Sequence, residues 1–65
     1  RAMYTTPITI DGKTYEIEYD LNAEGELTCY MPDGSPRLTV LRGLKIERVI
    51  ETHLRSYIQH PSKAT

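Results

Sequence analysis

Residues 14–21 alternate strictly between polar and apolar side chains, and this alternation constrains the fold more than any other feature of the chain. The apolar positions are Tyr15, Ile17, Tyr19 and Leu21, and the polar positions are Thr14, Glu16, Glu18 and Asp20. A period of two residues is typical of a β-strand that turns one face to a core and the other to solvent. Residues 13–21 therefore predict a half-buried strand with an acidic outer face.

The sequence just before this strand predicts its hairpin partner. Residues 8–10 end at Asp11-Gly12, a dipeptide that favours a two-residue hairpin turn. Closing that turn fixes one register, in which Ile10 pairs with Lys13, Ile8 with Tyr15, Thr6 with Ile17 and Tyr4 with Tyr19. The turn and the alternation agree, because this register places apolar side chains of both strands on the inner face.

A second turn leads to a third strand. Residues 23–25 suit a three-residue loop with Gly25 in the left-handed conformation. That loop pairs Leu21 with Leu27 and Tyr19 with Cys29. The third strand is expected over residues 26–31, with Leu27, Cys29 and Met31 facing inward and Thr28 and Tyr30 facing outward.

Residues 37–41 follow a turn cluster at residues 32–36, and their pattern allows two interpretations. The β-branched Thr39 and Val40 favour a fourth strand. A four-residue loop would then pair Met31 with Leu38 and Cys29 with Val40, which turns Leu38 and Val40 inward and Thr39 outward. The alternative begins a helix after Ser35, with Pro36 in its first turn. We favour the strand.

From Leu44 to about Gln59 the apolar period becomes helical. One broad face collects Ile46, Val49, Ile50, His53, Leu54, Tyr57 and Ile58. Gly43 precedes this run and His60-Pro61 ends it. The sequence therefore predicts an α+β domain, in which a four-stranded antiparallel β-meander is followed by one C-terminal α-helix packed on one face (ββββα). The alternative start of the helix would give βββα.

The length of the chain favours one small domain, residues 1–65, that associates with a second copy. A domain of 65 residues buries only about 60% of its unfolded surface. The single cysteine, Cys29, cannot form an internal disulfide, so we expect a homodimer to supply buried area, in a reducing, cytoplasmic setting. Residues 1–2 are expected to be a cloning remnant before Met3, and residues 61–65 a loose tail. No stretch approaches the ~20 apolar residues of a membrane helix, so no membrane partner is expected.

Charge is segregated along the chain. Residues 1–36 carry a net charge of −5 and residues 37–65 a net charge of +4, which together give −1. On the predicted fold these charges form an acidic sheet face and a basic helix face, and such charge separation favours contacts with partners. The candidate residues for protein interaction are Glu16, Glu18, Asp20 and Tyr30. The candidate residues for nucleic-acid binding are Arg42, Lys45, Arg48 and Arg55.

The predicted order of elements is similar in outline to that of Pur-type single-stranded nucleic-acid-binding domains, although no sequence motif accompanies the similarity. Such domains generally bind bases on the sheet face through aromatic stacking. Here the sheet face carries Glu16, Glu18 and Asp20 with the single aromatic Tyr30, and these carboxylates would repel phosphates. The resemblance therefore implies a fold and not a function.

Metal binding and catalysis find little support in the sequence. His53 and His60 are separated by about 10 Å of helix, and the ligands of one zinc ion lie ~2 Å from it. Cys29 is expected inward as a small hydrophobic residue, and His53 at the rim of the apolar face with one polar contact. The four glycines fit turns or helix boundaries, and a sheet with one helix leaves little room for a concave site. We expect no cofactor, no small-molecule substrate and no enzymatic activity.

These observations favour a small protein-binding or regulatory module that acts through charged surface complementarity, as a homodimer. The alternative is a nucleic-acid-binding protein that uses the basic face of the C-terminal helix. The two functions differ in salt dependence, because phosphate contacts weaken steeply as salt rises.

Overall fold

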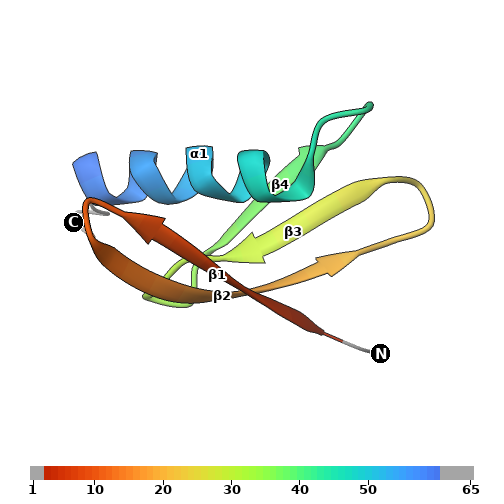
Figure 1. Cartoon of the computed structure of the whole chain (residues 1–65). Helices are drawn as coiled ribbons and strands as arrows, with labels where there is room; N and C mark the ends of the chain where they lie inside the picture. The colour runs from red at the N-terminus through yellow and green to blue at the C-terminus, as the bar shows by residue number, and fades with distance from the viewer. Residues whose placement is uncertain (1–2, 61–65) are drawn as a thin grey trace.

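The structure, a computed structural model, describes residues 3–60, so the expected remnant at residues 1–2 and the tail at residues 61–65 lie outside the described residues. It contains four strands and one helix: β1 (Tyr4–Ile10), β2 (Lys13–Leu21), β3 (Glu26–Tyr30), β4 (Pro36–Val40) and α1 (Ile46–Gln59). The strands form one antiparallel sheet in the order β1-β2-β3-β4 (Figure 1). This architecture confirms the predicted ββββα fold and excludes a helix that begins after Ser35.

The first two registers are those that the turns predict. All four pairs expected between β1 and β2 are present, from Ile10 opposite Lys13 to Tyr4 opposite Tyr19. Asp11 and Gly12 both have positive φ, 51° and 81°, as a hairpin turn of this length requires. Leu21 lies opposite Leu27 in the pairing of β2 with β3, as predicted. Local turn chemistry therefore determines the pairing of the first three strands.

Asn22 organises the loop between β2 and β3. Its side-chain Oδ1 accepts hydrogen bonds from the backbone N–H of Glu24 at 3.0 Å and of Glu26 at 2.9 Å. Gly25, at φ 80°, takes the left-handed conformation expected of it. The side chain of Asn22 thus provides an acceptor for two backbone N–H groups of the loop.

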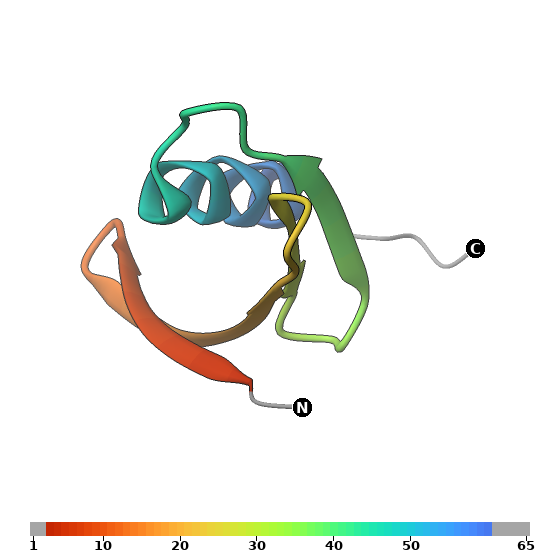
Figure 2. The same cartoon turned by 90° about the vertical axis from the view of Figure 1, so that its right-hand side faces the viewer.

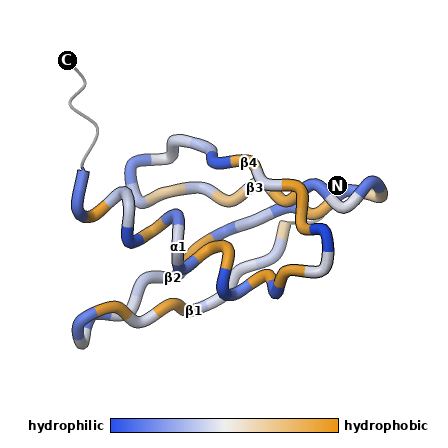
Figure 3. The backbone as a smooth tube through the Cα atoms, turned by 90° about the horizontal axis from the view of Figure 1, so that it is seen from above, coloured by the Kyte–Doolittle hydropathy of each residue, from blue (hydrophilic) through white to orange (hydrophobic). Residues whose placement is uncertain are grey.

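The sheet curves around the helix, so that α1 lies on its concave face between the two edge strands (Figure 2). Apolar and polar residues alternate visibly along the helix in Figure 3. Among residues 3–60 the core consists of nine buried residues contributed by both layers: Ile8, Ile10, Ile17, Leu27, Cys29, Met31, Val49, Ile50 and Leu54. The inward positions predicted for β1, β2, β3 and the helix account for this core.

The predicted register of β4 is wrong. Cys29 lies opposite Arg37 and not opposite Val40, a shift of three residues. Because three is odd, the shift reverses the faces of the strand. Leu38 and Val40 are consequently 63% and 45% exposed, whereas Arg37 and Thr39 turn toward the helix side. Thr39, expected on the outer face, therefore lies on the inner one.

The loop before β4 explains the shift. Met31 N–H donates to the Ser35 carbonyl at 2.9 Å, which closes a loop of three residues in place of the expected four. The carboxylate of Asp33 accepts hydrogen bonds from the backbone N–H of Ser35 at 2.9 Å and from its hydroxyl at 2.7 Å. Gly34 adopts φ 89°, a conformation that favours glycine. These contacts start β4 at Pro36, one residue earlier than predicted.

Candidate interaction surfaces

Strand β2 has two different neighbours along its length. It pairs with β1 from Lys13 to Tyr19, but with β3 only from Tyr19 to Leu21. Beyond Tyr30 the chain leaves the sheet and enters the loop before β4. Within the part of the chain that the structure describes, residues 13–18 of β2 therefore have a strand on one side only.

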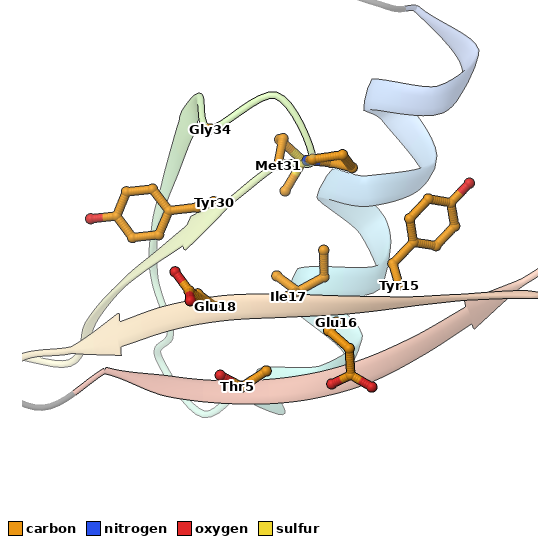
Figure 4. A pocket seen from close by; sticks show the side chains of 9 residues that line it. Thr5, Tyr15, Glu16, Ile17, Glu18, Tyr30, Met31 and Gly34 are labelled. Carbon is orange, nitrogen blue, oxygen red and sulfur yellow. The ribbon is translucent and has the colours of Figure 1, made fainter.

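A slot of about 440 Å³ occupies this opening, and we call it the β2–β3 slot. Its lining residues include Thr5, Glu16, Ile17, Glu18, Tyr30 and Met31. Ile17 and Met31 are buried and form an apolar floor, whereas Glu16 and Glu18 are exposed. Figure 4 shows Glu18 between β2 and β3, the Tyr30 ring directed away from β2, and the Glu16 carboxylate on the β1 side of β2. The slot is a concave surface on a fold that was expected to leave little room for one.

Three of the four predicted protein-interaction residues come together in the slot. Glu16, Glu18 and Tyr30 line it, whereas Asp20 lies further along β2, opposite Thr28, and outside the slot lining. Within residues 3–60, neither Glu16 nor Glu18 forms an ion pair. Two carboxylates without cationic partners make the slot suited to a positively charged group.

The four predicted nucleic-acid-binding residues do not form one surface. Lys45 and Arg48 line a groove of about 520 Å³ between β4 and α1, together with Thr39, Leu44 and His53. Arg42 lies nearby in the turn between β4 and α1, at φ 47°. Arg55 is exposed on the helix but donates to the Glu51 carboxylate from Nε at 3.1 Å and from Nη2 at 2.9 Å. The positive charge available to a ligand is therefore concentrated near the start of the helix.

His53 joins the helix to β4 at the base of this groove. Its Nε2 is hydrogen-bonded to Thr39 Oγ1 at 2.6 Å, the single polar contact that its position on the helix predicts. Partial burial lowers the pKa of His53, and the positive charge of Arg37 lowers it further. The neutral imidazole is therefore favoured, and the contact is a structural one across the helix–sheet interface.

Arg37 is the residue near the groove that sequence patterns do not single out. It is partly buried on the inner face of β4, where Nη1 donates to Ser35 Oγ at 2.9 Å and to the Pro36 carbonyl at 3.1 Å. These contacts hold its guanidinium near His53 and Cys29, both of whose pKa values its charge lowers in part. Only the correct register of β4 could have placed Arg37 there.

Cys29 is fully buried in the core, as predicted, and burial raises the pKa of its thiol despite the opposing charge of Arg37. Among residues 3–60, no three histidine, cysteine, aspartate or glutamate side chains are grouped so that they could hold a metal ion. The helix that the structure describes is too short and too polar to cross a membrane.

Comparisons with other proteins identify no relative. The chain matches no protein-family model, no curated protein and no solved structure. Any function must therefore be inferred from the two surfaces themselves.

Proposed function

We propose that this protein is a non-enzymatic binding or regulatory module, whose β2–β3 slot binds an extended, positively charged segment of a partner protein. The observation that carries the proposal is that Glu16 and Glu18 belong to the stretch of β2 that, among residues 3–60, pairs with a strand on one side only. The single buried cysteine supports a reducing, cytoplasmic setting. A homodimer remains a separate prediction, because nothing in the slot requires a second copy.

The slot offers three kinds of contact to such a segment. Unpaired peptide groups of β2 can form main-chain hydrogen bonds with an added strand, which provides affinity without sequence selection. The floor of Ile17 and Met31 can accept an apolar side chain, and Glu16 and Glu18 can bind lysine or arginine. Tyr30 can stack against a guanidinium. Alternation of apolar and basic residues in the ligand would satisfy all three.

The test is binding of a fluorescein-labelled decapeptide that alternates valine and arginine, measured by fluorescence anisotropy. We expect a Kd on the order of 1–100 μM for an interface of this size. The double variant Glu16→Lys/Glu18→Lys should weaken binding at least tenfold. The matched control is Glu24→Lys/Glu47→Lys, which changes the net charge equally at two exposed positions outside the slot.

If both double variants lose binding equally, the loss comes from the change in net charge, and the proposal that the peptide binds in the slot is contradicted. A peptide of the same composition with its arginines grouped at one end provides a second control, because it keeps the charge and loses the alternation. If that peptide binds as tightly as the alternating one, strand addition is excluded.

Nucleic-acid binding at the start of the helix is the second candidate, and the groove lined by Lys45 and Arg48 favours it. With Arg55 held by Glu51, three cations remain for phosphates, Arg42 among them. About three contacts predict a logarithmic salt slope near −2 on single strands. Binding of an oligonucleotide with this slope, abolished by Lys45→Glu/Arg48→Glu and retained by Glu16→Lys/Glu18→Lys, would replace the first proposal with the second.

A further inference from the structure

We infer that the free edge of β4 binds β4 of a second copy of this chain, antiparallel to it, so that the two sheets become one. The partner is the same surface of an identical molecule, an isologous contact with a two-fold axis. The inference does not depend on the β2–β3 slot, which lies on the far side of β3 from this edge. β4 is one of the two edge strands, and Figure 2 shows it at one end of the curved sheet.

Two backbone hydrogen bonds establish which peptide groups of β4 point outward. Ser35 accepts from Met31, and Leu41 donates to Gly25 at 2.9 Å, so residues 35 and 41 bond toward β3. Antiparallel bonding alternates with each residue, so Arg37 and Thr39 also bond toward β3. Leu38 and Val40 consequently direct their N–H and C=O groups away from the sheet, toward a second strand.

The same two residues present apolar side chains. Leu38 is the most exposed large hydrophobic residue among residues 3–60, at 63%, and Val40 lies beside it on the outer face of the sheet. Natural edge strands usually carry charges that prevent pairing with other chains. The single charged residue of β4 is Arg37, and its guanidinium is hydrogen-bonded to Ser35 and Pro36. This edge therefore combines unpaired peptide groups with apolar surface and lacks the usual protection.

The other edge strand, β1, is protected. Pro7 lies in its middle, opposite Glu16. Proline is accepted within a sheet where the missing N–H would point to the open side of an edge strand. The free edge of β1 thus lacks a donor at its centre. In β4 the proline is the first residue, Pro36, and the two donors that follow it are intact.

The geometry selects one register for the pair. Placing Leu38 opposite Val40 of the second copy, and Val40 opposite its Leu38, centres the two-fold axis on Thr39. Each of these residue pairs then exchanges two backbone hydrogen bonds, and Pro36, which has no N–H to donate, lies outside the pairing. Leu38 and Val40 of the two copies meet on one face, which gives a cross-strand apolar contact at each end of the pairing. A short interface of this kind predicts a weak dimer, with a Kd on the order of 1–100 μM.

Sedimentation velocity over a concentration series tests the inference. The wild-type chain should shift from its own mass of 7.5 kDa toward twice that mass as the concentration rises. Leu38→Lys should raise the dimer Kd at least tenfold, and circular dichroism should confirm that the exposed substitution leaves the fold intact. The matched control is Leu44→Lys, the same change at an exposed leucine outside β4, which should leave the Kd within about twofold of wild type.

Cysteine cross-linking tests the register. The Cα atoms of hydrogen-bonded antiparallel partners lie about 5.5 Å apart, which is within disulfide range. A mixture of Leu38→Cys and Val40→Cys chains should therefore form disulfide dimers faster than either variant alone. Cys29 is buried and does not compete. A wild-type chain that stays monomeric, or a dimer that Leu38→Lys and Leu44→Lys affect equally, would overturn the inference.

Discussion

Leu38 and Leu27 provide a direct test of the β4 register, because the two possible registers assign Leu38 opposite environments. In the structure Leu27 is 0% exposed and Leu38 is 63% exposed. Replacing a fully buried leucine by alanine costs about 2–5 kcal/mol of unfolding free energy. Full burial of a leucine side chain contributes about 1.5–3 kcal/mol, and only about a third of the Leu38 surface is buried. Leu38→Ala should therefore cost at most ~1 kcal/mol.

Urea unfolding followed by circular dichroism measures both losses. A chain of 65 residues is stable by roughly 3–10 kcal/mol, so Leu38→Ala should shift the midpoint modestly while Leu27→Ala should remove much of the transition. The experiment belongs at concentrations below about 1 μM, where a weak dimer is dissociated and adds nothing to the apparent stability. A loss above ~2 kcal/mol for Leu38→Ala would place Leu38 in the core and refute the register on which the β4 edge depends.

Two further predictions concern polar contacts. The pKa of His53 is lowered in the folded state, whereas in the unfolded chain it has its ordinary value of about 6.5. Below about pH 7 the unfolded chain therefore binds more protons than the folded one, so stability should fall as pH decreases from about 7 to 5. His53→Gln should flatten this pH dependence in thermal melts, and an unchanged slope would assign it to other groups. Asn22→Ala removes the acceptor of two backbone N–H groups and should cost about 1–2 kcal/mol in urea unfolding. The neighbouring Ala23→Ser, which loses no contact, should stay within about 0.5 kcal/mol of wild type.

The registers of β1, β2 and β3 could be predicted because each depends on a turn of two or three residues whose sequence dictates its geometry. Asp11-Gly12 and Gly25 adopt the positive φ values that those turns require. The β3–β4 loop differs because side-chain contacts of Asp33 with Ser35 shorten it. The apolar pattern predicts the wrong face because the shortened loop, and not the burial of Leu38 and Val40, determines the register of β4. Thr39 consequently faces inward, where it is hydrogen-bonded to His53, a contact between residues 14 positions apart that has no local sequence signal.

The candidate site was predictable in its residues and not in its shape. Alternation alone assigns Glu16 and Glu18 to the outer face of β2, and the strand after it assigns Tyr30 to the same face. The slot between them exists because β3 ends at Tyr30 while β2 continues to Lys13. The end of a strand depends on where the next loop begins, and here the loop begins at Met31. The hydrophobic side chain of Met31 instead predicts that this residue belongs to the strand.

A single three-residue shift therefore determines the character of both surfaces around β4. It turns Thr39 inward, where it lines the groove beside α1 and is hydrogen-bonded to His53, and it turns Arg37 to the same face of β4. It also turns Leu38 and Val40 outward, at the positions whose peptide groups are unpaired. In the alternative register the leucine and valine would enlarge the core, and Arg37 would lie on the outer face, where a charge discourages strand pairing. The observed fold thus gives up apolar burial in the monomer, and a second copy at the β4 edge would recover part of it through the cross-strand contact of Leu38 with Val40.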